Sequence, residues 1–387
     1  MLETSRFAAA AADLLRPPPL TTTPGSVYFD RNRNYNMVIG GAATPGGRIW
    51  AAWVSGGDDA NAYFVLASSD DDGRSWSAPR LVIDPPDHPI GLRVSVIVGN
   101  LWSGPTGRLW LFFDCSFEQF DGRAGTWCIH CDNPDDDMPG WSVPRYVGFG
   151  MALNKPIVLA SGTWLLPVSL WDRRWIAPRV LDLEPRAFAE LDRFRMSNVF
   201  ASDDQGRTWS RRGGVQIPRP QFDEAELVAR AGGELWMTCR SETGIWESLS
   251  TDDGATWTTP RPSSIGHINA RHCLFRLRSG RLLLVKHGQD AAVATAARHD
   301  LTAFVSEDDG RTWLGGLLLE RRRAHHCSYP DGFQLADERI CVMYDYGRDT
   351  PSEILLTQFT EEDVLAGRLI TPGSRLAMLV SRASGAR

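Results

Sequence analysis

Residues 250–257 read Ser-Thr-Asp-Asp-Gly-Ala-Thr-Trp, and the same spacing of Ser, Asp, Gly, Ser or Thr, and Trp returns in three other places. The other copies begin at Ser69, Ser202 and Ser306, and a degenerate copy lies between Asp135 and Trp141. Each good copy follows a short apolar run such as LTAFVS, which is typical of the end of a strand. An Asp that caps backbone N–H groups and a Gly that supplies a positive φ indicate a tight turn. We therefore expect each copy to be a turn with a structural role, and its aspartates to be poor catalytic candidates.

The segments between these turns predict a unit of four strands, with the turn between the third and the fourth. The units begin near residues 36, 93, 154, 224, 272 and 328. Repeats of short antiparallel strands at such intervals are typical of a β-propeller. We predict an all-β protein, a six-bladed β-propeller of four-stranded antiparallel blades, in which residues 21–387 form a single domain. The outermost strand of the sixth blade comes either from residues 375–382 or from the segment before Tyr35.

Two short helices are expected outside the blades. Residues 1–20 read as an N-terminal extension with a helix over residues 4–15, which Pro17 stops. The segment after Thr360 reads as a second helix, because a Thr followed by acidic residues is a helix-start signal.

The composition argues against several classes of partner. The net charge of −6 comes from interspersed acidic and basic residues, so we expect neither a nucleic-acid nor a membrane partner. There is no apolar run of transmembrane length and no basic segment of a secretory signal, which favours a cytoplasmic protein. The seven Cys are scattered, and Cys128, His130 and Cys131 have no second pair with metal-ligand spacing. We expect no metal and no cofactor.

Propeller geometry selects the candidate functional residues. The inner strands begin around one end of a central channel, and the loops between second and third strands lie at that same end. Glu224, Arg240, Arg298, Tyr329 and Asp58 occupy such places, whereas the repeated turns occupy the opposite end. Each also has an ordinary structural interpretation, for example an ion pair between Glu224 and Arg240 or a core Tyr at position 329.

The eight-residue repeat resembles the Asp box of the sialidase superfamily, and the candidate residues fall where that family's motifs do. EAELVARAGGELWMTCR resembles the family's fourth-blade segment, with Glu224 at its start and Arg240 at its end. The sequence RHDLT, which begins at Arg298, resembles the motif before the third strand of blade five, and Tyr329 follows 31 residues after Arg298. Asp58 is the best match for an Asp in the loop before the third strand of blade one.

The resemblance implies a sialidase-like exo-glycoside hydrolase that acts on a small acidic sugar. In that interpretation Tyr329 is the nucleophile, Glu224 accepts its proton and Asp58 is the acid and base. Arg240 and Arg298 bind the sugar's carboxylate, since forked guanidinium groups suit that anion. A neutral Tyr avoids the repulsion that this carboxylate would exert on an anionic nucleophile.

One family residue has no counterpart. Sialidases begin blade one with the first of three carboxylate-binding arginines, where this chain has Tyr35, Asn36 and Met37. Arg33 and Arg93 are the candidates to reach the same point. We expect the true substrate to be an acidic sugar held by two arginines, and common sialosides to be poor substrates.

Several alternatives stay open at this point. His272 and His287 lie near strand ends and are candidate sugar ligands, although a structural role is the better interpretation of each. A polysaccharide lyase would use Tyr329 and a His such as His272 on a uronate. A non-catalytic carbohydrate-binding propeller is the third possibility. The oligomeric state is not predicted.

Overall fold

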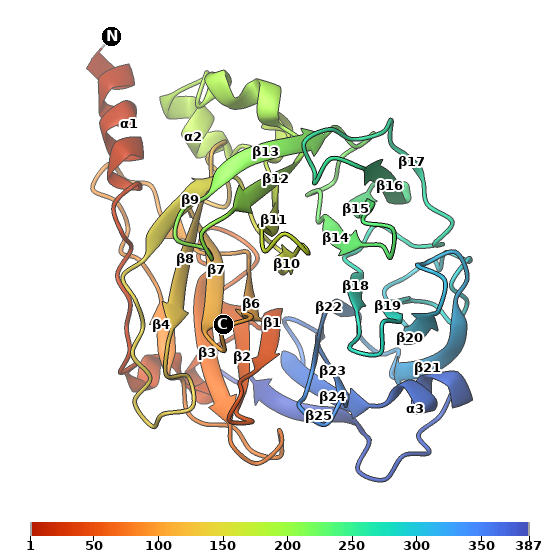
Figure 1. Cartoon of the computed structure of the whole chain (residues 1–387). Coiled ribbons are helices and arrows are strands. Elements are labelled where there is room, and N and C mark those ends of the chain that lie inside the picture. The colour runs from red at the N-terminus through yellow and green to blue at the C-terminus, as the bar shows by residue number, and fades with distance from the viewer. Residues whose placement is uncertain (1, 386–387) are drawn as a thin grey trace.

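The computed structural model describes residues 2–385, in which six antiparallel sheets surround a central axis (Figure 1). Strands within each sheet follow chain order, and Figure 1 shows the colour passing once around the ring until blade six lies beside blade one. The predicted all-β, six-bladed propeller is confirmed. The strands of blades one to three are β1 Met37–Ala43, β2 Ile49–Ser55, β3 Tyr63–Ser69, β4 Leu81–Ile83, β5 Val94–Ser95, β6 Gly99–Ser103, β7 Leu109–Phe117, β8 Gly125–Cys131, β9 Arg145–Phe149, β10 Ile157–Val158, β11 Trp164–Ser169, β12 Ser197–Ser202 and β13 Ser210–Val215.

Blades four to six repeat the same order. Their strands are β14 Glu226–Ala229, β15 Leu235–Ser241, β16 Gly244–Ser250, β17 Arg261–Pro262, β18 Cys273–Arg276, β19 Leu282–His287, β20 Leu301–Ser306, β21 Leu314–Glu320, β22 Cys327–Gln334, β23 Ile340–Tyr346, β24 Glu353–Phe359 and β25 Arg375–Arg382. Apolar side chains from facing sheets form the core between neighbouring blades, with Trp50, Trp110 and Trp236 fully buried there. The blades therefore hold one another by the burial of large apolar surfaces.

The repeated turn has the hydrogen bonds that its sequence predicts. Asp252 accepts from the backbone N–H of Thr256 at 2.9 Å and from its hydroxyl at 2.6 Å. Gly254 adopts a φ of +86°, a conformation that favours Gly. The bonds from Thr256 hold the pKa of Asp252 down at about 2. Asp71, Asp204 and Asp308 make the same pair of bonds, so these four carboxylates are structural.

The degenerate copy serves a different purpose. Asp135 accepts hydrogen bonds from Thr44 and from the backbone of Gly46, both in the turn between β1 and β2. It therefore joins the turn of blade two to blade one rather than stabilising its own turn.

Blade two departs from the simple unit because its inner strand is interrupted. The backbone N–H groups of Ile97 and Val98 bond to the buried side-chain carboxylate of Asp114 on β7, at 2.7 and 2.8 Å, instead of to backbone carbonyls of that strand. The inner strand is consequently split into β5 and β6, and both pieces pair with β7.

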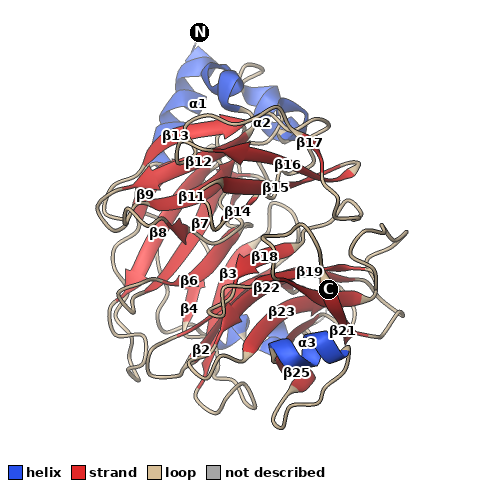
Figure 2. Cartoon of the chain, turned by 45° about the vertical axis from the view of Figure 1, so that its right-hand side comes forward, coloured by secondary structure: helices blue, strands red, loops and turns tan. Residues whose placement is uncertain are grey.

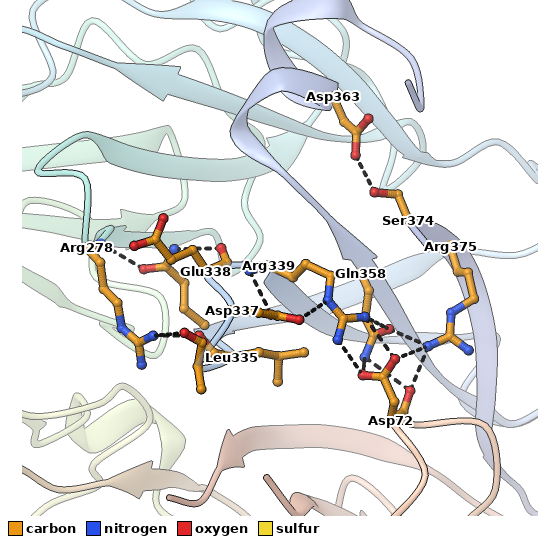
Figure 3. A network of polar contacts seen from close by, with 12 residues as sticks. Asp72, Arg278, Leu335, Asp337, Glu338, Arg339, Gln358, Asp363, Ser374 and Arg375 are labelled. Atoms are coloured by element: carbon orange, nitrogen blue, oxygen red, sulfur yellow. Dashed lines mark hydrogen bonds and ion pairs between the residues drawn. The ribbon is translucent and has the colours of Figure 1, made fainter. Parts of the chain in front are cut away.

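Residues 375–382 supply the outermost strand of blade six, so every blade is one continuous piece of sequence. Among residues 2–385 no strand is exchanged between the first and last blades, and side-chain contacts help to close the ring. Asp72, in the first repeated turn, accepts both ends of the Arg339 guanidinium at 2.9 and 3.0 Å. Arg375 bonds the same carboxylate at 2.8 Å, and Gln358 lies between the two arginines (Figure 3).

This closing network makes Asp72 a stabilising residue. Replacing Asp72 by Asn preserves the shape and the left-handed backbone, which Asn tolerates, but removes the charge between two arginines. We expect the free energy of unfolding in urea to fall by about 1–2 kcal/mol, since the group is partly screened by water. Asp253→Asn is the matched control, because Asp253 occupies the same place in another turn and lies 3.8 Å from Arg212. Equal effects of the two substitutions would contradict this role.

In the described part of the chain, three α-helices lie outside the sheets. The first, α1 at Leu2–Asp13, covers most of the predicted helix, and the insertion of blade three contains α2 at Pro178–Leu183. These two helices contact each other (Figure 2). Helix α3 at Glu361–Ala366 begins with the predicted cap at Thr360. Short 3₁₀ helices occupy Ser26–Tyr28, Asp30–Asn32, Arg173–Trp175 and Ala189–Phe194. Within residues 2–385, none of the helices has the length and apolar character that crossing a membrane requires.

Candidate active site

A tyrosine, a glutamate and an arginine from three parts of the sequence meet at the end of the channel opposite the repeated turns. The hydroxyl of Tyr329, on β22, donates to Oε1 of Glu224 at 2.6 Å. Nη1 of Arg240, near the end of β15, donates to the same oxygen at 2.8 Å. Glu224 is fully buried and Arg240 nearly so, whereas Tyr329 is partly exposed. The three residues therefore form a Tyr–Glu pair held on one side by a guanidinium.

The backbone on both sides of this pair is unusual. Tyr329 has a φ of +53° and lies in a β-bulge of β22 between Ser328 and Asp331. Phe222 and Asp223, directly before Glu224, have φ values of +63° and +40°. Left-handed backbone is rare for residues other than Gly and gathers at functional sites, where the surrounding structure enforces it.

Asn269 places a second guanidinium beside Arg240. Its side-chain oxygen accepts from Nε of Arg240 at 2.6 Å, and its backbone carbonyl accepts from Nη2 of Arg298 at 3.1 Å. Arg298 also donates to the hydroxyl of Ser328 at 3.3 Å. All these bonds from Arg298 go to neutral groups, so its positive charge is not neutralised by a carboxylate hydrogen bond.

Arg348 is a third guanidinium of this end of the channel, and it is not among the predicted residues. It follows β23 and lies 4.4 Å from the centre of the Tyr329 ring. Its Nη1 donates to Asp58 at 3.1 Å, and its Nε donates to the buried Asp345 at 3.2 Å. The sequence offered a signal for it, because Arg348 comes just after the second strand of blade six, as Arg240 ends the second strand of blade four.

Asp58 is exposed in the loop between β2 and β3, where two preceding glycines have positive φ values of +89° and +157°. Its contact with Arg348 joins blade one to blade six at this end of the channel. The group formed by these residues is called the cluster: Asp58, Glu224, Arg240, Arg298, Tyr329 and Arg348. An exposed carboxylate at this rim can exchange protons with water, which an acid and base must do.

Electrostatics favour an uncharged tyrosine. Burial, and after it the adjacent Glu224 carboxylate, raises the pKa of Tyr329 far above its ordinary value. The phenol therefore keeps its proton at neutral pH and needs an acceptor for it during any attack. Burial, followed by repulsion from Arg240 and Arg348, lowers the pKa of Arg298.

Two hollows border the cluster on either side of Arg348. One, of about 500 Å³, is lined by Asp58, Tyr35 and Arg348. The other, of about 380 Å³, is lined by Arg298, Ser328 and Arg348. A larger cavity of about 570 Å³ occupies the part of the channel nearer the repeated turns, where Lys155, Glu226 and Asp331 line it. We place the candidate chemistry beside the smaller hollows, because Arg298 and Arg348 line them and Arg348 lies against the ring of Tyr329.

The remaining predicted residues do not join the cluster. Arg93 is exposed, and its guanidinium lies 3.7 Å from Asp87. Arg33 is buried and bonded to Asp30, Asn36, Ser55 and Ser381. Neither arginine fills the place of the absent blade-one arginine.

His272 and His287 are both fully buried. His272 bonds the hydroxyl of Thr238 at 2.7 Å, and His287 bonds the carbonyl of Cys327 at 2.8 Å. Burial lowers the pKa of each ring to about 3, so both are neutral. Without a rearrangement neither ring reaches a bound sugar. His272, the base that a lyase would use, is therefore not accessible to a substrate.

Arg271 lies next to the cluster, and the sequence analysis did not identify it. Its guanidinium lies 5.6 Å from the Tyr329 ring, and it bonds Asn154 and Asp331. Arg271 and His272 are consecutive and both buried. The sequence does not indicate which of the two side chains lies near Tyr329. Within residues 2–385 there is no group of three or more His, Cys, Asp or Glu that could hold a metal ion.

Comparisons with known proteins find sialidases that are similar in sequence to parts of this chain. The human protein Sialidase-4 is 32% identical over 129 residues, which are 32% of this chain and 24% of that protein. The sialidase of Vibrio cholerae serotype O1 is 28% identical over 188 residues, which are 40% of this chain and 23% of that protein. The match thus spans about a quarter of each of these relatives.

A solved structure shows the same fold along nearly the whole chain. The intramolecular trans-sialidase from Ruminococcus gnavus, in complex with oseltamivir carboxylate, has a TM-score of 0.66 at 14% identity. The superposition covers 88% of this chain and 97% of that chain. The sequence model of a family described as the BNR repeat-like domain matches residues 47–342, which include the four repeated turns and most of the cluster. With more than half of its length matched, the chain belongs to the BNR repeat-like domain family.

Proposed function

We propose that this protein is a sialidase-type glycoside hydrolase that removes a terminal acidic sugar. The observation that carries the proposal is the 2.6 Å hydrogen bond between Tyr329 and a Glu224 oxygen that Arg240 also binds. A neutral tyrosine with a buried proton acceptor is a nucleophile suited to an anomeric centre that carries a negative charge. A glycosidase for neutral sugars ordinarily uses two carboxylates instead.

In the first half of the proposed reaction, Oη of Tyr329 bonds to the anomeric carbon while Glu224 takes the phenolic proton. The bond to the leaving oxygen breaks, and that oxygen keeps the electron pair and receives a proton from Asp58. In the second half, water attacks the anomeric carbon and gives its proton to Asp58. The bond to Tyr329 breaks, and Oη recovers its proton from Glu224, so the net reaction is hydrolysis.

The guanidiniums of Arg240 and Arg298 would bind the carboxylate of the acidic sugar. Among the residues that the structure describes, Arg298 hydrogen-bonds only neutral groups, and Asn269 bonds both Arg298 and Arg240. Paired guanidiniums bind a carboxylate through charge-assisted, forked bonds. Relatives named as sialidases, and a structural neighbour in complex with oseltamivir carboxylate, support a small acidic ligand.

Steady-state kinetics on matched fluorogenic glycosides test the proposal. Methylumbelliferyl N-acetylneuraminide, a deoxy-ulosonide and a glucuronide would be compared with a neutral glucoside and galactoside. We expect at least one acidic substrate to reach a kcat/KM of about 10⁴ M⁻¹s⁻¹, and the neutral ones to be inert.

The other outcomes distinguish the alternatives. Release of an unsaturated uronate, seen by its ultraviolet absorbance, would replace hydrolysis by elimination. Binding of acidic sugars without turnover of any glycoside would favour a carbohydrate-binding propeller. Preferential turnover of the neutral glycosides would contradict the proposed roles of the arginines.

A further inference from the structure

Arg348 lies beside the position where the resemblance to sialidases calls for an arginine. The backbone N–H of Asn36 donates to the carbonyl of Arg348 at 3.1 Å, so the two residues are direct neighbours across the junction of blades one and six. The side chain of Asn36 is fully buried and donates to the carbonyl of Ser352 at 2.8 Å. Asn36 therefore cannot bind a ligand itself, and the adjacent chain of blade six brings a guanidinium to this corner.

The surroundings of Arg348 fit a ligand-binding residue. It forms part of the lining of both hollows and lies against the ring of Tyr329. Its Nη2 is buried and makes no hydrogen bond of normal geometry with the described residues, although the guanidinium interacts with the Tyr35 hydroxyl. A buried guanidinium N–H without an acceptor is costly, which favours a site completed by a ligand or water.

The partner of Nη1 is also easily exchanged. Asp58 is exposed and contributes one 3.1 Å bond, so water competes with this ion pair. The buried Asp345 instead anchors Arg348 through Nε. Arg348 is thus held in place by a buried carboxylate, while the partner of its Nη1 is exposed to exchange with water or a ligand anion.

We infer that Arg348 is a substrate-binding residue, which supplies from blade six the third guanidinium that blade one lacks. The inference rests on the proposed acidic-sugar site and adds Arg348 to the residues that bind the sugar. A carboxylate would lie among Arg240, Arg298 and Arg348 rather than between two arginines. The absence of an arginine at Asn36 then no longer argues against sialic acid as the sugar.

Binding of free sugar acids tests this inference separately from catalysis. The probes are N-acetylneuraminic acid and D-glucuronic acid, each beside its methyl ester, measured by calorimetry on the full chain. We expect Arg348→Gln to weaken binding of the preferred acid by about 10- to 150-fold, the range for one charge-assisted bond, and to leave the ester unchanged. Arg348→Lys keeps the charge beside Asp345 and is expected to weaken binding less. Thermal unfolding identifies any variant that fails to fold.

Two further variants decide between roles for Arg348. Arg323→Gln is the matched control, since Arg323 is exposed and pairs with Asp300. Asp58→Asn removes the other member of the ion pair. If Arg348 only positioned Asp58, both Arg348→Gln and Asp58→Asn would slow turnover without weakening binding of the acid, and the inference would be overturned.

Different results overturn the role of Arg348 and the proposed hydrolase activity. Unchanged acid binding in folded Arg348 variants, with turnover of acidic glycosides by the wild-type protein, overturns the inference and leaves the proposed function intact. Acid binding that depends on Arg348, with no turnover by the wild type, supports the inference and removes the hydrolase. A wild-type protein that binds none of the acids overturns both.

Discussion

Replacing Tyr329 by Phe is expected to reduce the turnover of an acidic glycoside by about three orders of magnitude or more, because it removes the nucleophile itself. The ring remains beside Arg348, and Glu224 keeps its bond from Arg240. Binding of the free sugar acid should therefore change little. The free energy of unfolding should fall by only about 1 kcal/mol, the net value of one lost hydrogen bond. Kinetics, calorimetry and urea unfolding on one preparation measure all three quantities.

Tyr28→Phe is the matched control for this substitution. Tyr28 also donates its hydroxyl to a carboxylate, Asp84, at 2.9 Å, but it lies outside the cluster. It should retain wild-type turnover while losing a similar amount of stability. Near-wild-type activity of Tyr329→Phe would exclude a tyrosine nucleophile, whatever the effect on stability.

Replacing Arg240 by Met is expected to have the largest effect on stability. Glu224 is completely buried, and Arg240 is the cation that bonds it, at 2.8 Å. Removal of one partner leaves an uncompensated buried charge, which costs about 3–5 kcal/mol. We expect a loss of that size in urea unfolding, together with the loss of acid binding and turnover.

Arg298→Met separates binding from stability. Arg298 donates to Asn269 and Ser328, which are neutral, so no buried carboxylate loses its partner. We expect acid binding to weaken as in Arg240→Met, with a stability loss of only about 1 kcal/mol. The double substitution Arg240→Met with Glu224→Gln should recover part of the lost stability. Equal destabilisation by Arg240→Met and Arg298→Met would contradict this account.

The fold was predictable because its signal is local and repeated. Asp252 and Thr256 lie four residues apart, and the bonds between them need no distant partner. The break of the inner strand in blade two was not predictable. It depends on a buried Asp114 meeting Ile97 and Val98, a contact that strand periodicity does not encode.

The candidate site was predictable only where a residue matched a family motif or a strand end. Glu224, Arg240 and Tyr329 come together as their positions in the blades suggested. Arg348 belongs to no matched motif, and although it follows a strand end, its contacts with Tyr329 and Asp58 are what identify it. His272 was a candidate sugar ligand from its place near a strand end, but it is buried and bonds Thr238 of the adjacent blade. Alternation along a strand cannot say which side chains a neighbouring blade will cover.

The closure of the ring by side chains has a consequence for biosynthesis. Each blade is a continuous segment, so its own strands can pair as soon as that segment has been made. The candidate site cannot form in the same stepwise manner, because Asp58 of blade one meets Arg348 of blade six across the closing junction. Five finished blades would hold Glu224, Arg240 and Arg298 but lack Tyr329 and Arg348. The growing chain therefore has no complete candidate site until blade six has packed against blade one and closed the ring.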